Sequence, residues 1–281
     1  MSRIHNVEVD GTTSQGKPAH ATGPAAAAAN PPSALRRVRA CWRLCRAVFE
    51  GLRGLGVCVI AFPFLDRTQR MRQVGVWASR TLGALDITLH VQGEIHAAPV
   101  LIAGNHVSWL DILAIDAVHP VRFVSKAEAR HWPVLGYMIE CGGTLFIERE
   151  RKRDAMRVVH QVAQALTDGH TVAVFPEGTT SDGTGLLPFH ANMLQAAIAT
   201  ETPVQPIALR YADVHNAVSP AAPYVGETTL AQSLWAIALA EGLTVRVTVL
   251  DSQGTRHLDR RALAQKLRGE VAEALGVAEN E

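Results

Sequence analysis

From about residue 85 onward, short apolar runs alternate with segments whose apolar residues recur at helical spacing. Residues 99–103 form a fully apolar run of the kind found in strands buried on both faces. Residues 153–166 have helical spacing, and Gly169 follows them as a helix stop. This alternation predicts an α/β domain with a mixed, largely parallel sheet flanked by helices. We expect strands near residues 87–91, 99–103, 121–124, 144–147, 171–175, 203–209 and 243–250, and helices near 110–118, 153–166, 192–199 and 259–275.

The charge of the chain is distributed unevenly, although its net value is only +1. Ten arginines between Arg36 and Arg80 stand against two acidic residues, Glu50 and Asp66, a balance of +8 that leaves −7 for residues 81–281. Residues 36–80 are thus a basic arm, and residues 81–281 are an acidic body. This arrangement indicates that the arm lies near an anionic surface, either nucleic acid or a membrane.

The first 80 residues divide into two parts. Residues 1–33 are rich in Ala, Pro and Gly and lack the apolar core of a secretory signal, so we expect a disordered tail. Residues 34–80 combine arginines with Trp42 and an uncharged stretch at 54–65, which predicts a basic amphipathic, membrane-associating helical segment and favours lipid over nucleic acid. The stretch is shorter than the roughly 20 residues of a spanning helix, which favours an interfacial or re-entrant attachment. The alternative is a surface helix packed on the core of the α/β domain, residues 81–281.

A histidine and an aspartate directly follow the first buried strand, at positions 106 and 111. Ligands of α/β sheets bind at the carboxyl ends of strands, so His106 is well placed for chemistry. Residues five positions apart do not lie on the same face of a helix. Asp111 can nevertheless fold back on His106 if the histidine lies in the turn and the aspartate lies in the first helical turn. Asp111 would then fix the tautomer of His106, whose other nitrogen acts as a general base. Alternatively, Ser108 and Asp111 form a capping box and His106 satisfies backbone carbonyls.

Two further motifs follow predicted strands. Residues 146–149 read Phe-Ile-Glu-Arg, in which Arg149 can clamp a phosphate with its planar guanidinium, although 148–153 is equally typical of a solvated charge run. Residues 175–181 read Phe-Pro-Glu-Gly-Thr-Thr-Ser, which places Glu177 on a rigid turn where the backbone can approach a ligand, or forms an ordinary loop. Pro206, inside a strand pattern, predicts an edge strand or a strand end.

In this order, the motifs resemble the four blocks of the glycerolipid acyltransferase family of the PlsC type. The blocks are Asn-His-x-Ser-Trp-x-Asp at 105–111, Phe-Ile-Glu-Arg at 146–149, Phe-Pro-Glu-Gly-Thr at 175–179 and Val-x-Pro at 204–206. Residues 123–136 also match the stretch that this family places between its first two blocks. The resemblance covers residues 75–215, about half of the chain, and four ordered blocks make it highly specific.

The resemblance implies an O-acyltransferase that moves an acyl group from acyl-CoA or acyl carrier protein to a lysolipid hydroxyl. In the bacterial type the acceptor is the sn-2 hydroxyl of 1-acyl-sn-glycerol-3-phosphate and the product is phosphatidic acid. His106 would deprotonate the hydroxyl and Asp111 would orient His106. The acceptor would be held by residues from the later blocks, namely Arg149 at the head group, Lys126 as a further phosphate contact, and Glu177, Gly178 and Thr179 as the walls of the pocket.

The chemistry implied by the resemblance needs no bound cofactor. The sequence has no Gly-x-Ser-x-Gly elbow, so no covalent acyl-enzyme is expected. Backbone amides near His106 or Gly178 would stabilise the oxyanion of the tetrahedral intermediate. The four cysteines and the histidines fit no metal-ligand spacing, so no metal is expected.

Thr180 is a departure from the family pattern, in which this position is commonly arginine. The missing cation suggests an acceptor without a simple phosphomonoester, as in the related lyso-ornithine lipid acyltransferases, whose block resembles Gly-Thr-Thr. Alternatively, Lys126 and Arg149 suffice for lysophosphatidate, which family frequency favours.

The basic arm and the lipid chemistry together predict an enzyme at the cytoplasmic face of the inner membrane, with the anionic lipid surface as a partner and no nucleic acid. Two other functions fit parts of the sequence. One is an arginine-rich module that binds anionic surfaces without catalysis, and the other is a soluble thioester hydrolase that uses the same His106–Asp111 pair.

Overall fold

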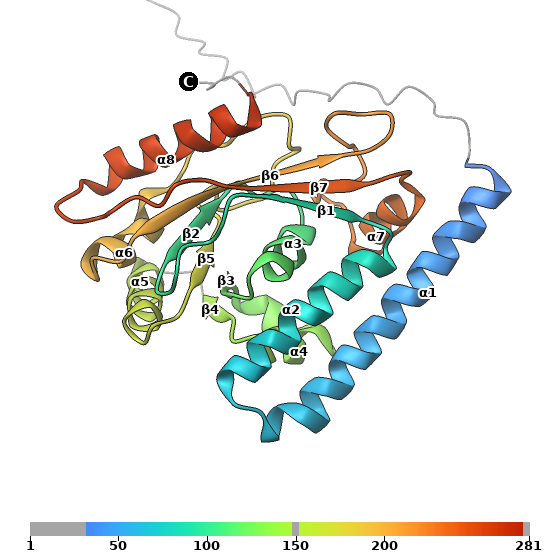
Figure 1. Ribbon diagram of the computed structural model, residues 1–281, viewed down its shortest axis with the longest axis horizontal. Coiled ribbons are helices and arrows are strands. Elements are labelled where there is room, and N and C mark those ends of the chain that lie inside the picture. The colour runs from blue at the N-terminus through green and yellow to red at the C-terminus, as the bar shows by residue number, and fades with distance from the viewer. Residues whose placement is uncertain (1–31, 148–151, 278–281) are drawn as a thin grey trace, which may run out of the picture. The chain divides into compact units, whose positions relative to one another are not determined.

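The structure is a computed structural model, and it describes residues 32–147 and 152–277. The predicted disordered tail, residues 1–33, falls almost entirely outside the described residues, and so does Arg149. The body is an α/β fold, as predicted, and Figure 1 shows its sheet with helices on both faces.

The sheet has seven strands in the order β1-β7-β6-β2-β5-β3-β4. All neighbouring pairs are parallel except β6 and β7, which are antiparallel, so the predicted mixed, largely parallel sheet is confirmed. The carboxyl ends of β2, β3, β4, β5 and β6 therefore meet at one edge of the sheet. The strands are β1 (Thr88–Gln92), β2 (Leu101–Gly104), β3 (Arg122–Lys126), β4 (Leu145–Ile147), β5 (Val172–Val174), β6 (Val204–Ala212) and β7 (Thr244–Val249).

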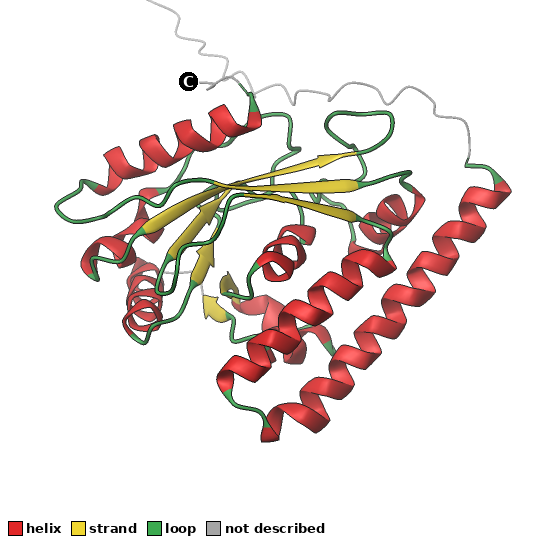
Figure 2. Cartoon of the chain, in the orientation of Figure 1, coloured by secondary structure: helices red, strands yellow, loops and turns green. Residues whose placement is uncertain are grey.

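Helices cover the two faces of the sheet as separate layers (Figure 2). One core packs α2, α3 and α7 against side chains such as Ile102 and Leu209, and the other packs α5, α6 and α8 against Leu101 and Ala208. Adjacent residues of one strand thus serve opposite cores, as the two-residue period of a strand requires. The helices are α1 (Ala34–Gly56), α2 (Arg67–Ala84), α3 (Leu110–Val118), α4 (Leu135–Cys141), α5 (Lys152–Thr167), α6 (Gln195–Ala199), α7 (Leu230–Leu239) and α8 (Arg260–Leu275).

Pro206 lies near the start of β6, which is an interior strand, so of the two predicted alternatives the edge strand is wrong and the strand end is confirmed. β6 lies between β7 and β2, and Pro206 pairs with Ala103 of β2. The ladder between β6 and β7 ends at Ile207, and the carbonyl of Pro206 accepts a hydrogen bond from the amide of Leu250 at 3.0 Å. In a strand, the backbone nitrogen and the carbonyl oxygen of one residue point toward the same neighbouring strand. The N–H that Pro206 lacks would therefore point toward β7, at a position where the regular ladder between β6 and β7 has already ended.

The N-terminal segment forms a helical hairpin. α1 continues through a π-helical turn at Val57–Ala61 and a 3-10 turn at Phe62–Phe64, and α2 then begins behind an Asp66–Gln69 capping box. The helical stretch Ala34–Phe64 is long and apolar enough to cross a membrane by length and composition. The hairpin ends at Ala84, a few residues beyond the predicted segment 34–80.

One face of α1 is attached to the body through Arg43, which is 5% exposed. Its guanidinium donates to the carbonyl oxygens of Ala238 at 2.9 Å and Ala240 at 2.6 Å, at the end of α7, and to the Asp86 carboxylate at 2.5 Å. Carbonyls at a helix end lack partners within the helix, so this arginine satisfies them in place of water.

Replacing Arg43 with Met should loosen α1 from α7 without unfolding the body. Two backbone carbonyls would lose a charged donor, at a cost of about 1–3 kcal/mol for the docking of the helix. Hydrogen exchange in residues 34–56 should accelerate, while exchange in β2 and β6 stays slow. Arg39→Met is the matched control, because Arg39 is exposed on the same helix. Equal exchange in the two variants would show that Arg43 does not hold the helix.

Candidate active site

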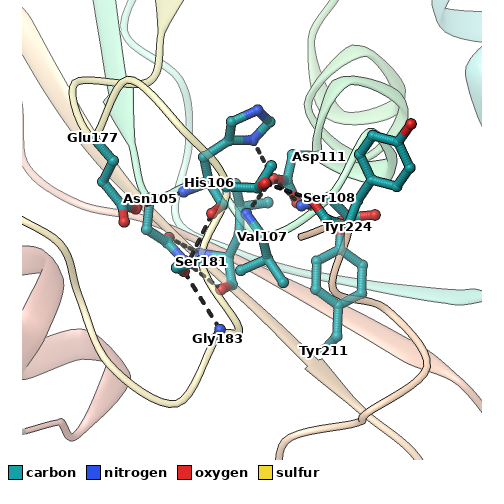
Figure 3. A network of polar contacts seen from close by, with 12 residues as sticks. Asn105, His106, Val107, Ser108, Asp111, Glu177, Ser181, Gly183, Tyr211 and Tyr224 are labelled. Atoms are coloured by element: carbon teal, nitrogen blue, oxygen red, sulfur yellow. Dashed lines mark hydrogen bonds and ion pairs between the residues drawn. The ribbon is translucent and has the colours of Figure 1, made fainter. Parts of the chain in front are cut away.

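The site is built around a pair formed by His106 and Asp111 (Figure 3). His106 follows β2, and Asp111 lies in the first turn of α3. The imidazole Nδ1 lies 2.7 Å from Oδ2 of Asp111, so the aspartate does fold back on the histidine. A carboxylate at Nδ1 fixes the proton on that nitrogen and leaves the lone pair of Nε2 free to accept one.

Asp111 is fully buried, and four donors surround its carboxylate. Oδ2 accepts from the His106 ring and from the amides of Val107 at 2.7 Å and Ser108 at 2.9 Å. Oδ1 accepts from the Tyr211 hydroxyl at 2.7 Å. Only one half of the alternative capping box forms: Asp111 accepts from the Ser108 amide, but the Ser108 hydroxyl has no partner among the described residues.

The backbone of His106 is held on both sides by the turn after β5. Its amide donates to Glu177 Oε1 at 2.7 Å, and its carbonyl accepts from the amide of Ser181 at 2.7 Å. The ring stacks on Phe175 with centroids 4.0 Å apart and planes 7° apart. The side chain is 21% exposed, so the imidazole can reach a ligand while its orientation is fixed.

Glu177 is buried within this turn and acts on the backbone. Its second oxygen accepts from the amide of Leu187 at 3.1 Å, and the residue is 3% exposed. Burial raises the pKa of the Glu177 carboxyl to about 7, against the lowering effect of the hydrogen bonds from the His106 and Leu187 amides. Both oxygens are thus engaged by the protein, and the geometry makes Glu177 a support for His106.

The structure describes some of the other residues predicted for the acceptor pocket, but not all of them. Gly178 adopts a φ of +73°, which favours glycine, and Thr179 is exposed beside it. Thr180 donates its hydroxyl to the carbonyl of Tyr224. Lys126 is the last residue of β3, at the same edge of the sheet as His106, whereas Arg149 lies outside the described residues, two positions after β4 ends.

The amides expected to bind the oxyanion are already engaged. Those of Val107 and Ser108 donate to Asp111, that of His106 donates to Glu177, and that of Gly178 donates to the carbonyl of Phe175 at 3.0 Å. These four donors hold the turns in place. Among the described residues, no cluster of three or more His, Cys, Asp or Glu side chains is arranged to hold a metal ion.

Sequence reasoning assigned no role to three contributors to the site, two of which lie within the quoted motifs. Tyr211 comes from β6, Ser181 from the loop after β5, and the side-chain amide of Asn105 pairs with the backbone of Leu209 at 2.7 and 2.9 Å. Tyr211 carried a readable signal: it shares a strand face with Ile207 and Leu209, and a buried tyrosine hydroxyl usually needs a partner. The sequence did not indicate which partner.

Comparison with known proteins gives concordant results. Residues 86–210 match the model of the family described as Acyltransferase. A 1-acyl-sn-glycerol-3-phosphate acyltransferase from Neisseria gonorrhoeae is 41% identical over 201 residues, which is 70% of this chain and 78% of that protein. A lyso-ornithine lipid O-acyltransferase from Pseudomonas aeruginosa is 35% identical over 234 residues, 80% of this chain and 90% of that protein. The crystal structure of the 1-acyl-sn-glycerophosphate acyltransferase PlsC from Thermotoga maritima aligns with a TM-score of 0.65 and 18% identity, covering 88% of this chain and all of that one.

Replacing Tyr211 with Phe should lower kcat about tenfold with little change in KM. The change removes one charged hydrogen bond from Asp111, worth about 1.5 kcal/mol or more, and lets the carboxylate and His106 shift. Because the hydroxyl is buried against Asp111, its loss should act on the orientation of His106 and so on kcat rather than on substrate binding. Tyr137→Phe is the control, since Tyr137 is exposed on α4. An unchanged kcat, or a raised KM with kcat unchanged, in Tyr211→Phe would contradict a positioning role.

Replacing Glu177 with Gln should change how stability depends on pH. The pKa of Glu177 is about 7 in the folded protein against an ordinary 4.5, so its contribution is fully present below about pH 4.5 and is lost as the pH rises to about 7. Relative to Glu177→Gln, the wild-type free energy of unfolding should therefore fall by up to about 3 kcal/mol between pH 4.5 and 8. Urea unfolding across this range measures the difference. For Glu227→Gln, at an exposed position, the free energy of unfolding should depend on pH as it does in wild type. The same pH dependence in Glu177→Gln as in wild type would refute the raised pKa of Glu177.

Proposed function

The chain belongs to the acyltransferase family, and on that basis we propose that it moves a fatty acyl group from acyl-CoA or acyl carrier protein to the sn-2 hydroxyl of 1-acyl-sn-glycerol-3-phosphate. The observation that carries the proposal is the buried Asp111 carboxylate 2.7 Å from Nδ1 of His106, with no hydrogen bond to Nε2 from any residue in the described ranges. The product would be phosphatidic acid, for phospholipid biosynthesis.

In the proposed reaction Nε2 of His106 takes the proton of the acceptor hydroxyl. The hydroxyl oxygen attacks the thioester carbonyl carbon and forms the new C–O bond. The tetrahedral intermediate then collapses with cleavage of the C–S bond, and the imidazolium returns its proton to the departing thiolate. Asp111 keeps Nδ1 protonated throughout and stabilises the imidazolium charge.

The acceptor head group is proposed to bind where the carboxyl ends of β3 and β4 meet. Lys126 pairs in register with Ile147, the last described residue before Arg149 in the sequence. Cations at this edge would contact a phosphate while the hydroxyl lies at His106. Gly178 and Thr179 are proposed to form the opposite wall.

A lyso-ornithine lipid acceptor is the second candidate, and Thr180 favours it. Its side chain is bound to the Tyr224 carbonyl, so the protein uses this position to fix a loop where many family members place a cation. The lyso-ornithine lipid O-acyltransferase from Pseudomonas aeruginosa is among the relatives. We prefer lysophosphatidate because the relatives of higher identity bear that name.

We further propose that the enzyme works at the cytoplasmic face of the inner membrane, attached through α1. The face of α1 away from α7 exposes a stripe of large apolar side chains, and the turns that follow add Ile60 at 71% and Phe64 at 87% exposure. Exposed arginines such as Arg37 and Arg39 lie on the same helix. This combination suits the boundary between head groups and acyl chains. The apolar stripe consists of Leu35, Val38, Trp42, Phe49 and Leu52.

A panel of lysolipids tests the acceptor and the reaction together. Wild-type protein with radiolabelled acyl-CoA or acyl carrier protein should form product with 1-acyl-sn-glycerol-3-phosphate, and His106→Ala should lower the rate by at least about 10²-fold because the general base is lost. Circular dichroism and the Tm of the variant check that it remains folded.

The other results of the panel are equally decisive. Incorporation only into lyso-ornithine lipid would replace the preferred acceptor with the second candidate. Release of free fatty acid without any lysolipid would indicate a thioester hydrolase. Full turnover by a folded His106→Ala variant would overturn the mechanism.

A further inference from the structure

A cavity lies at the edge of the sheet opposite to His106. It has a volume of about 960 Å³ and is walled by one face of α2, the end of α3 and the segments that lead into β3 and β5. Arg122, which lines it, is the first residue of β3, whereas Lys126 is the last. At about 3.3 Å per residue, the two backbones lie about 13 Å apart. The cavity is therefore distinct from the proposed acyl-transfer site, and its size is that of an ordinary ligand pocket.

The walls of this cavity are strongly basic. Arg67, Arg72 and Arg80 contribute from α2, and Arg122 contributes from β3. Within the described part of the chain, none of the three α2 arginines has an ion pair. Asp116 is the one acid among the lining residues, all of which the structure describes, and burial raises its pKa to about 8, which leaves it mostly neutral at pH 7. The lining residues therefore offer the four positive charges no ionised carboxylate at this pH.

The positive charges contribute to lowered pKa values of two groups that line the cavity, His170 and Arg122. Burial lowers the pKa of His170 to about 4, and the charges of Arg122 and Arg67 contribute to the shift. Burial and then Arg67 also lower the pKa of Arg122. The charge of Asp168, a carboxylate outside the lining, acts in the opposite direction on both pKa values, but its side chain is exposed and accepts a hydrogen bond from Gln164 at 2.8 Å. The charges are therefore poorly compensated within the described residues.

A half-buried guanidinium and a buried hydroxyl line the same cavity with donors to spare. Arg122 uses Nε for the carbonyl of Gly143 at 2.7 Å, and its remaining nitrogens have no hydrogen bond within the described ranges. Thr171 is 6% exposed, and its hydroxyl has no partner among the described residues. Buried polar groups are almost always hydrogen-bonded, so an unpartnered hydroxyl beside free guanidinium nitrogens indicates a missing acceptor.

We propose that this cavity binds a phosphate group, carried either by a phospholipid head group or by a soluble phosphate compound. A phosphate accepts hydrogen bonds on several oxygens, and the planar guanidinium matches two of them at once. Arg122 and Thr171 form the base of the site, and Arg67 and Arg72 close it from α2. The site is separate from the acceptor contacts proposed for Lys126 and Arg149 and does not depend on the proposed reaction.

Titration of the full-length protein with inorganic phosphate tests the proposal. At constant ionic strength, set by exchange against chloride, phosphate should raise the Tm of wild type in a saturable manner. Arg67→Gln/Arg72→Gln should weaken the apparent affinity about tenfold or more, as expected for lost charged hydrogen bonds. Thr171→Val should also weaken it while leaving the Tm without phosphate unchanged or higher, because its hydroxyl has no partner to lose.

Two control variants separate this site from other sources of the effect. Arg260→Gln/Arg261→Gln removes the same charge from the exposed start of α8 and should retain the phosphate response. Lys126→Gln/Arg149→Gln alters the proposed acceptor site and should retain it too. An equal response in all variants would indicate a general ionic effect, and a response lost only in Lys126→Gln/Arg149→Gln would assign it to the acceptor site. Either result would overturn the proposal.

Vesicles distinguish the two sources of phosphate. Sedimentation with phosphatidylcholine vesicles, with and without phosphatidylglycerol, is compared between Arg67→Gln/Arg72→Gln and Arg260→Gln/Arg261→Gln. A selective loss of binding to phosphatidylglycerol in the first variant identifies a lipid head group as the ligand. A phosphate response that depends on Arg67 and Arg72 without this loss identifies a soluble phosphate compound. If neither the phosphate response nor the binding to phosphatidylglycerol depends on Arg67 and Arg72, the proposed site is wrong, whatever the outcome of the lysolipid panel.

Discussion

The Asp111 carboxylate is the interaction on which the arrangement of the site depends. It is buried, and four hydrogen bonds compensate for its lost hydration. Two of these bonds fix the turn between β2 and α3, one orients His106, and one reaches across to Tyr211 of β6. The two roles that the sequence left open, helix-start support and histidine orientation, are thus filled by the same oxygen. A substitution at Asp111 would disturb both.

Parallel strands explain why motifs so far apart in the sequence meet. β2 and β5 are neighbours and run in the same direction, so the residues after each strand emerge side by side. Glu177 and Ser181 then bind the amide and carbonyl of His106, while Asn105 binds both backbone groups of Leu209. The turn after β5 thus holds the backbone of the histidine and β6 holds the residue before it, a rigidity that favours a single orientation of the ring.

The sequence predicted the strands, most helices and the His106–Asp111 contact, because each depends on local pattern. Periodicity tells which face of a strand is buried but not which neighbour it meets, so the bond from Tyr211 to Asp111, 100 positions apart, was not predictable. The same holds for Arg43 and Ala240, 197 positions apart. Pro206 misled because a missing N–H is tolerated in an interior strand wherever one ladder has ended. The placement of Arg149 remains a prediction.

The basic arm has fewer free charges than its net value of +8 suggests. Three of its arginines are paired with carboxylates at 2.5–3.2 Å, namely Arg36 with Glu241, Arg43 with Asp86 and Arg53 with Glu50. Three others have no ion pair among the described residues but line the cavity at the amino-terminal edge of the sheet, namely Arg67, Arg72 and Arg80. Surface attraction to an anionic membrane is worth only about 1 kcal/mol per free cation and is screened by salt. Burial of a large apolar side chain is worth about 1.5–3 kcal/mol, so the apolar stripe of α1 should contribute more to membrane attachment than the arginines do.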